Sequence, residues 1–228
     1  MAVLDNPAWS ALTTNHAHLA MGALARRYPL DMAPIGAIDR RDPAAFEELA
    51  DLTPVGDWIS LPATLDELAT LVPARLRITL QKHLVQMVCE RRTEVPALPI
   101  DVAVLSEADI PDMQELTALT HPGPFRSHTY TLGTYLGIRA DGHLVAMAGQ
   151  RMHVPGFREI SAVCTHPAFE GRGYARGLVT RLIAAIHDEG LVPFLHVEES
   201  NERARSVYRG LGFSERRRLP LLVAERVE

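Results

Sequence analysis

Residues 159–175 read Glu-Ile-Ser-Ala-Val-Cys-Thr-His-Pro-Ala-Phe-Glu-Gly-Arg-Gly-Tyr-Ala, an apolar run that ends in a turn with two glycines. Beyond the turn, apolar side chains recur at helical spacing at Leu178, Val179, Leu182, Ile183 and Ile186. The stretch therefore predicts a strand, a glycine loop and a helix packed on a sheet. Glycines in such a loop often serve only a steric purpose. They also let a pyrophosphate approach the free N–H groups at the positive end of the new helix.

The residues before this stretch predict an antiparallel meander. Residues 135–139 and 144–148 flank Asp141-Gly142, a dipeptide that suits the positive dihedrals of a type I′ hairpin turn. A second turn at Pro155-Gly156 leads into the strand at 159–165. Further upstream, residues 106–120 predict a helix, which the prolines and glycine of residues 121–125 must end.

The residues after the glycine loop predict a return to the sheet. Gly190 ends the long helix, and residues 193–197 predict a strand parallel to the one before it, because crossovers of this kind are right-handed. Residues 201–209 predict a short helix closed by Gly210. Gly212-Phe213 then begins a predicted terminal hairpin, whose last strand covers residues 219–227.

The chain divides into two halves near its middle. Pro96, Pro99 and the polar stretch 89–94 interrupt the apolar pattern there. We therefore expect a first unit at 1–95 and a second at 100–228.

The first half carries fewer signals. Asp42 before Pro43 predicts one helix start, the pair Thr64 and Glu67 predicts another, and residues 55–60 form a short strand between them. We find no catalytic motif in residues 1–95. His16 and His18 have no evident third ligand, so we expect no metal.

The composition is that of an ordinary globular protein. The 228 residues are 47% hydrophobic and 22% charged, and no apolar run approaches the roughly 20 residues that span a bilayer. Because no secretory signal opens the chain, we expect a cytoplasmic protein with no membrane partner. The formal charge of -5 disfavours nucleic acid, and the arginines at 216–218 are interpreted as a solvated run. Cys89 and Cys164 are interpreted as buried thiols.

The order of these elements resembles a known family. Residues 100–228 resemble a GNAT N-acetyltransferase domain through 159–167, 171–175 and the stretch 201–213, which holds Asn-x-x-Ala-x-x-x-Tyr and Leu-Gly-Phe. The overall similarity is greatest to the glycine N-acyltransferase-like branch, in which a degenerate GNAT-like half precedes the catalytic one. The resemblance implies an α/β (α+β) fold, with a mixed, mostly antiparallel, twisted central sheet flanked by helices.

The resemblance also implies where coenzyme A binds. The pantetheine arm would lie beside the strand at Val163, Cys164 and Thr165, as an added strand does. The pyrophosphate would meet the backbone N–H groups of Gly171, Arg172, Gly173, Tyr174 and Ala175. Glu170 departs from the family's Gln or Arg, so no binding role is given to its carboxylate. Asn201 would reach the pantetheine, cap the following helix, or do both.

Two side chains are candidates for the chemistry. An amine attacks a thioester only when it is neutral, so a base near the amine and a donor near the sulfur would both help. The resemblance implies that Glu159 is the base, although it could equally be an exposed strand residue. It implies that Tyr208 is the donor to the departing sulfur, although an aromatic at this spacing is often core. A backbone N–H near Val163 or Cys164 would meet the oxyanion, and Cys164 is not needed as a nucleophile.

The acceptor pocket is expected beside the loop at His121, Phe125 and Arg126, where Arg126 or His128 pairs with a substrate carboxylate or is simply solvated.

The function expected is transfer of an acyl group, most often acetyl, from acyl-CoA to a primary amine of a small molecule or amino acid, without a metal. A homodimer is compatible with the resemblance. The alternative is a non-catalytic acyl-CoA-binding or regulatory protein. A nucleotide-binding protein of another fold is disfavoured, because no Gly-Lys-Ser/Thr loop follows a strand.

Overall fold

The structure, a computed structural model, describes residues 2–40, 42–62, 71–92 and 101–228. Within these ranges, eight strands form one sheet in the order β3-β10-β4-β9-β8-β7-β6-β5, and β1 and β2 form a separate pair. The strands are β1 (Ala25–Arg27), β2 (Gly36–Ile38), β3 (Trp58–Leu61), β4 (Leu76–Val88), β5 (Ala103–Val104), β6 (Tyr135–Ala140), β7 (His143–Val154), β8 (Phe157–Thr165), β9 (Val192–Glu198) and β10 (Ser214–Arg226). The helices are α1 (Pro7–Thr13), α2 (Pro43–Asp51), α4 (Ile110–Thr120), α5 (Tyr174–Asp188) and α6 (Glu202–Gly210). None of the described helices is long and apolar enough to cross a membrane.

The sheet is mostly antiparallel, as the sequence predicts. β6, β7 and β8 form the expected meander, and Asp141 and Gly142 turn the hairpin with φ angles of 50° and 84°. β8 and β9 are the parallel pair, joined by α5. The predicted mixed, helix-flanked architecture is therefore confirmed.

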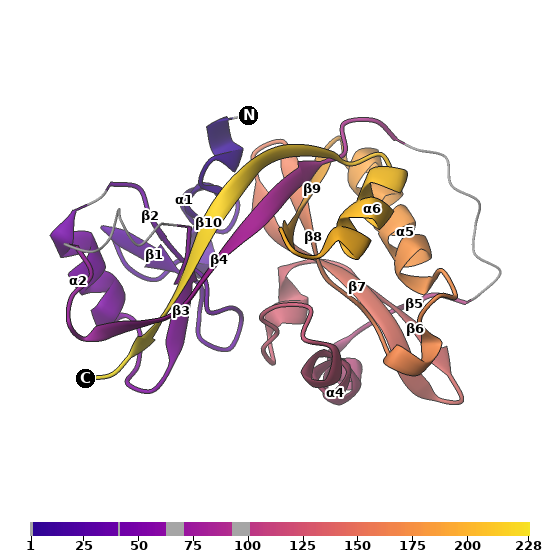
Figure 1. The fold of residues 1–228 in the computed structure, drawn as a ribbon, viewed down its shortest axis with the longest axis horizontal. Coiled ribbons are helices and arrows are strands. Elements are labelled where there is room, and N and C mark those ends of the chain that lie inside the picture. The colour runs from indigo at the N-terminus through magenta and orange to yellow at the C-terminus, as the bar shows by residue number, and fades with distance from the viewer. Residues whose placement is uncertain (1, 41, 63–70, 93–100) are drawn as a thin grey trace.

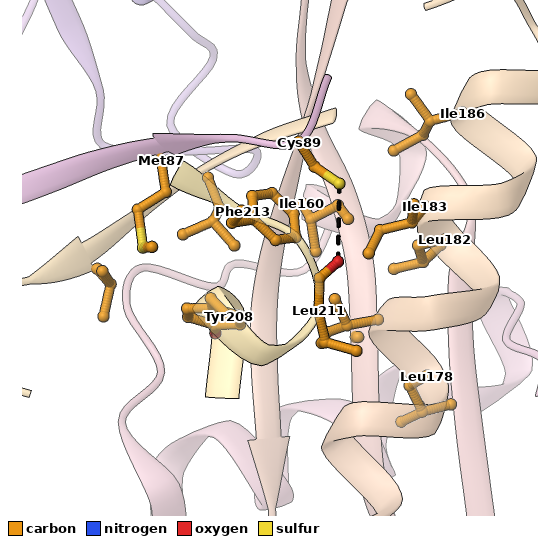
Figure 2. Packing of buried hydrophobic residues seen from close by; sticks show 14 of the residues in the cluster. Met87, Cys89, Ile160, Leu178, Leu182, Ile183, Ile186, Tyr208, Leu211 and Phe213 are labelled. Carbon is orange, nitrogen blue, oxygen red and sulfur yellow. Dashed lines mark hydrogen bonds between the residues drawn. The ribbon is translucent and has the colours of Figure 1, made fainter. Parts of the chain in front are cut away.

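Helices cover both faces of the sheet. On one face, α5 and the C-terminal end of α6 pack on apolar side chains of β4, β8 and β9. Figure 2 shows that Leu178, Leu182 and Ile186 of α5 point into this core. On the other face, α1 packs on alternate residues of the same strands, such as Val88 and Phe194. α4 covers the neighbouring part of that second face, over β7 and β8. The sheet is thus the middle layer of the molecule.

β4 and β10 form a long two-stranded arm (Figure 1). The arm begins beside β9 and runs away from the α5 and α6 side of the molecule to β3. There α2 packs against β3 and β10 through a third apolar cluster that includes Phe46, Leu49, Ile59 and Leu222. Segments from both ends of the sequence therefore share one sheet.

The helix starts agree with the sequence where they can be compared. Asp42 accepts a hydrogen bond from the N–H of Ala44 and caps α2. The strand predicted at 55–60 is confirmed in part, because β3 begins at Trp58 and extends to Leu61. The helix start predicted at Thr64 and Glu67 lies outside the described residues, as do Pro96 and Pro99.

The predicted terminal hairpin is wrong. Residues 214–226 form one continuous strand, β10, which pairs with β4 along its length and with β3 near its end. A bulge at Arg216 bends this strand without ending it. The arginines at 216–218, interpreted as a solvated run, are instead held by ion pairs with Asp5 and Glu199, and Glu215 beside them binds Arg205 of α6.

Candidate active site

β8 and β9 separate at the centre of the sheet. They pair only from Phe157 with Val192 to Ile160 with Leu195, and the rest of β8 has no described strand on that side. A bulge on the β7 side, where Ala162 has a φ of 52°, tilts the following residues. The predicted coenzyme edge, Val163 to Thr165, lies along this opening. The Thr165 hydroxyl is buried with no hydrogen-bond partner among the described residues, so a polar ligand could satisfy it.

The glycine loop follows directly. Gly171 and Gly173 have φ angles of 77° and 80°, which L side chains rarely adopt, and α5 begins at Tyr174. No described residue accepts a hydrogen bond from the N–H groups of residues 171–176. These groups lie at the positive end of a 15-residue helix and fit a pyrophosphate.

The charges around the loop suit an anion as well. The Glu170 carboxylate pairs with Arg203 of α6 at 2.7 Å, and the Arg172 guanidinium lies 4.6 Å from the centre of the Phe169 ring. Arg203 of α6 therefore offsets the negative charge of Glu170, which stands where the family's loop has Gln or Arg.

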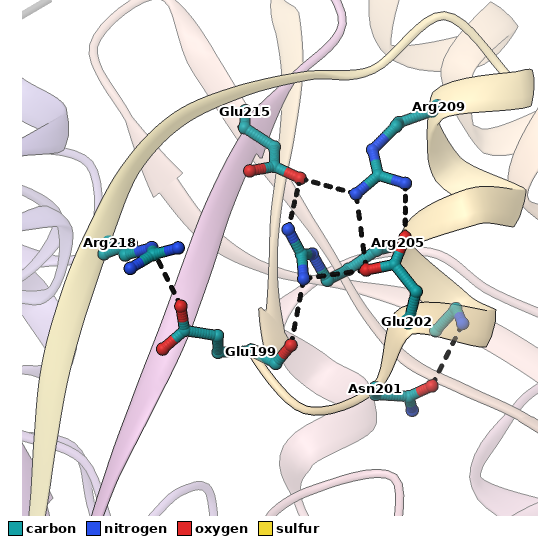
Figure 3. A network of polar contacts seen from close by, with 8 residues as sticks. Glu199, Asn201, Glu202, Arg205, Arg209, Glu215 and Arg218 are labelled. Carbon is teal, nitrogen blue, oxygen red and sulfur yellow. Dashed lines mark hydrogen bonds and ion pairs between the residues drawn. The ribbon is translucent and has the colours of Figure 1, made fainter.

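A surface network ties α6 to β10 (Figure 3). Arg205 and Arg209 of α6 both bind Glu202 and the Glu215 carboxylate of β10, while Arg218 binds Glu199. The Asn201 side chain accepts from the N–H of Ala204 at 3.0 Å, so it caps α6, one of its two expected roles. This network fixes the helix that carries Tyr208.

Tyr208 lies in the wall of the cleft described below. Its ring packs edge-on against Phe213 at 5.9 Å, and 9% of the residue is exposed. Its hydroxyl makes no hydrogen bond to any described residue. Burial raises the Tyr208 pKa to about 12, and burial raises that of the nearby Cys164 thiol to about 11. Both groups stay protonated at neutral pH, which suits Tyr208 as a proton donor and Cys164 as a bystander.

Glu159 is fully buried, so its reading as an exposed strand residue is wrong. Both carboxylate oxygens accept hydrogen bonds from the Arg151 guanidinium at 2.8 Å, and Oε1 also accepts from His196 Nδ1 at 2.8 Å. Burial alone would raise the pKa, but Arg151 and His196 outweigh it and lower the Glu159 pKa to about 2. Glu159 is a carboxylate at neutral pH, and it meets the cleft through these two partners.

The contacts continue as a polar row across five neighbouring strands. The Gln86 amide donates to the Leu4 carbonyl and to His196 Nε2, while its oxygen accepts from Arg216. The His196 ring therefore lies between the Glu159 carboxylate on its Nδ1 side and the Gln86 amide on its Nε2 side. The row was missed in the sequence, although Gln86 and His196 each interrupt an apolar strand and so mark buried polar positions.

A single cleft of about 1570 Å³ joins these parts. It is lined by the β8 edge, the glycine loop, Tyr208 and Asn201 on one side, and by Arg151 and His196 at its centre. On the other side it is lined by residues of the first half and the arm, including Pro7, Trp58, Ser60 and Leu84. These first-half residues were not recognised in the sequence, because no local motif marks them.

The structure places the three residues predicted to line the acceptor pocket in different surroundings. His121 lines the cleft, where it ends α4 in a left-handed conformation. Phe125 packs edge-on against Tyr135 at 5.7 Å, and Arg126 binds Asp57 at 2.9 Å; neither is among the lining residues. His128 pairs with Asp31. The described residues contain no group of three or more His, Cys, Asp or Glu placed to hold a metal ion.

The fold and the cleft together define an α/β protein in which an open strand edge and a glycine loop line the same cleft. Residues 135–220 match the family model described as FR47-like protein. The chain is 32% identical over 126 residues to N-alpha-acetyltransferase RimI of Mycobacterium tuberculosis, which covers 50% of this chain and 78% of that protein. A putative GNAT-family acetyltransferase from Novosphingobium aromaticivorans superposes with a TM-score of 0.87 at 33% identity over 98% of both chains.

A GCN5-related N-acetyltransferase from Kribbella flavida has the same fold, with a TM-score of 0.62 at 18% identity over 96% of this chain and 94% of that one. The chain belongs to the GNAT family of acetyltransferases. Enzymes of this family use acetyl-CoA as co-substrate.

Proposed function

We propose that this enzyme transfers an acetyl group from acetyl-CoA directly to a primary amine of a small molecule or amino acid. The observation that carries the proposal is the opening between β8 and β9, because it places a free strand edge, the glycine loop and Tyr208 on one cleft. Gly171 to Ala175 would bind the pyrophosphate through backbone N–H groups, and Val163 to Thr165 would pair with the pantetheine. Asn201 would add its exposed amide to the same ligand.

In the proposed reaction the amine nitrogen bonds to the carbonyl carbon of the thioester, and the carbon–sulfur bond breaks. Tyr208 gives its proton to the departing sulfur and later regains one from solvent. Glu159 accepts the proton that the amine loses, either directly or through a water. Because Glu159 is clamped by Arg151 and carries a low pKa, its role as base stays a prediction.

We further propose that the chain belongs to the glycine N-acyltransferase-like branch, with residues 1–95 as an accessory, degenerate GNAT-like half and residues 100–228 as the catalytic one. The contribution of Pro7, Trp58 and Ser60 to the cleft supports an accessory role for the first half. In this proposal the first half shapes the acceptor side, and the second half binds the coenzyme.

The test is release of free thiol from acetyl-CoA with a panel of amines, amino acids and short peptides, alongside calorimetric binding of CoA. Turnover with a small amine supports the proposal, and turnover only with peptides would show that the acceptor is a protein. The clamped carboxylate of Glu159 favours one alternative, a non-catalytic acyl-CoA-binding protein. Tight CoA binding with no turnover across the panel would establish that alternative.

A further inference from the structure

The arm presents an apolar face to the cleft. Cross-strand partners in an antiparallel pair point to the same side of a sheet, and Leu84 pairs with Leu219, Lys82 with Leu221, and Leu80 with Val223. All six of these residues line the cleft. We call Leu80, Leu84, Leu219, Leu221 and Val223 the arm face. Along β10 these side chains form an unbroken apolar row next to the predicted transfer point, and on β4 Lys82 lies between Leu80 and Leu84.

The arm face is long as well as apolar. His196 pairs with Gln86 at the centre of the cleft, and Leu84 and Leu80 lie two and six residues further along β4. At about 3.3 Å per residue, the floor extends from roughly 7 to 20 Å from this point. Trp58 of β3, which pairs with the cleft-lining Glu225, lies on the same side of the cleft. A methyl-sized acceptor would leave nearly all of this surface in water.

The charged groups on this side are already paired. Lys82 binds Glu198, Glu225 binds Arg77, and Arg151 is held by Glu159. Among the described residues that line the arm side of the cleft, these pairs account for every Lys, Arg, Asp and Glu. An acceptor whose body carries a second charge would therefore find no free counter-ion here, whereas an uncharged body needs none.

We propose, on the basis of the function proposed above, that the acceptor is a small primary amine carried on an uncharged apolar body, and that this body lies on the arm face. The amine would reach the opening between β8 and β9 beside His196, and the body would cover Leu84, Leu219 and Leu221. A peptide fits this floor less well. Its backbone N–H and C=O groups would be laid against leucine side chains, where they lose hydrogen bonds to water.

The first experiment measures kcat/KM for thiol release at saturating acetyl-CoA with ethylamine, butylamine, hexylamine and phenethylamine. Each carries one ammonium group, so only the apolar body changes. Burial predicts a rise of about fourfold for each added methylene until the floor is covered. 1,6-Diaminohexane and 6-aminohexanoate match hexylamine in length and add a second charge, so both should be at least tenfold poorer.

Matched variants locate the effect. Leu84→Asp places a charge on the arm face, whereas His83→Asp places one on the adjacent exposed residue, whose side chain points to the opposite face of β4. Leu84→Asp should lower kcat/KM for hexylamine at least tenfold more than it lowers that for ethylamine. His83→Asp should leave the whole series unchanged. Leu221→Asn on β10 repeats the test if Leu84→Asp fails to fold.

Several outcomes would overturn the inference while leaving the proposed function intact. They are a chain-length series that is flat, a preference for 6-aminohexanoate, or a gain from hexanoyl-CoA in place of longer amines. A peptide with an apolar N-terminus that exceeds every amine would overturn the inference and the small-molecule acceptor together. If no amine is acetylated, calorimetry of hexylamine with the CoA complex decides. Binding that Leu84→Asp abolishes would retain the apolar site and reject the enzyme, and no binding would reject both.

Discussion

Tyr208 lines the cleft, and its hydroxyl has no hydrogen-bond partner among the described residues, although the residue is buried. A donor to the departing sulfur is needed only as charge develops, so Tyr208→Phe should lower kcat roughly 100-fold. The ring and its contact with Phe213 remain, so CoA affinity should stay within about 1 kcal/mol. Steady-state thiol release and calorimetric CoA binding measure the two quantities.

Tyr130→Phe is the control, because this tyrosine packs beside α4 and is not among the residues that line the cleft. It should leave kcat within about twofold. An unchanged kcat in Tyr208→Phe, confirmed in single turnover, would make Tyr208 a core residue only.

Glu159 should reveal its ion pair through the pH dependence of stability. Its pKa is lowered from an ordinary value of 4.5 to about 2, so the stabilisation is present above pH 4.5 and is lost as the pH falls to about 2. At pH 7, Glu159→Gln should lower the free energy of unfolding by about 3 kcal/mol, because Arg151 loses its buried partner. The difference from wild type should shrink towards zero near pH 2.

Urea unfolding of both proteins between pH 7 and pH 2 tests this, since all other carboxylates are common to the pair. Glu170→Gln, which removes an exposed partner of Arg203, should change stability at pH 7 by less than about 0.5 kcal/mol. A Glu159→Gln difference that is constant with pH would contradict the assigned ionisation.

For single residues, the sequence predicted which residues belong to the site better than it predicted the side chains that surround them. Spacing and family resemblance placed Glu159 and Tyr208, but no local pattern reports that Arg151 and His196 enclose Glu159. Those partners come from the neighbouring strands β7 and β9, and their approach depends on sheet order. The same holds for Arg126, whose partner Asp57 is 69 positions away.

Among the elements, the glycine loop allows the most direct test. Gly171 and Gly142 have φ angles of 77° and 84°, and a Cβ at either position would meet nothing within 4 Å. Valine at either site should therefore cost a similar 1–2 kcal/mol or so of stability through backbone strain alone. Only Gly171→Val would obstruct the proposed pyrophosphate site, so only it should weaken CoA binding by more than about tenfold.

Calorimetric CoA titration and urea unfolding of the two valine variants provide the comparison. Equal CoA affinity in Gly171→Val and wild type would remove the loop from the coenzyme site. A loss shared with Gly142→Val would instead attribute the change to general destabilisation.

Local chemistry explains which elements were predictable. The β6–β7 hairpin follows from Asp141-Gly142, and α2, α5 and α6 follow from their caps and apolar spacing. The terminal hairpin was wrong because nothing local shows that residues 214–226 pair along their whole length with the distant strand β4, and the partners of the arginine run at 216–218 are distant as well. Asp5 and Glu199, which neutralise that run, lie far from it in the sequence.

For the molecule as a whole, the arm and the N-terminal segment are joined through Arg216. This side chain binds the Gln86 oxygen at 2.8 Å, the Leu4 carbonyl at 3.4 Å and Asp5, with 16% of it exposed. Arg216→Met keeps the apolar stem and removes these bonds, so it should lower the free energy of unfolding by about 1–3 kcal/mol. Urea unfolding at neutral pH measures the change.

Arg218→Met is the matched control two residues along the same strand. Its guanidinium is 70% exposed and pairs with Glu199 at the surface, so its removal should cost less than about 0.5 kcal/mol. Equal losses in the two variants would show that Arg216 contributes no more than a surface arginine.

The long-range order of the sheet also bears on how the protein is made. β4 lies between β9 and β10, and Ser214 meets Val88 across 126 positions of sequence. During synthesis from the N-terminus, β4 therefore leaves the ribosome long before β9 and β10 have been made. β3 pairs with β10 and so cannot enter the sheet until β10 has been made. Contacts so far apart slow folding, and an unpaired strand is prone to association with other chains. We expect nascent chains that stop before β10 to depend on chaperones, and the full chain to gain protease resistance only once β10 has been released.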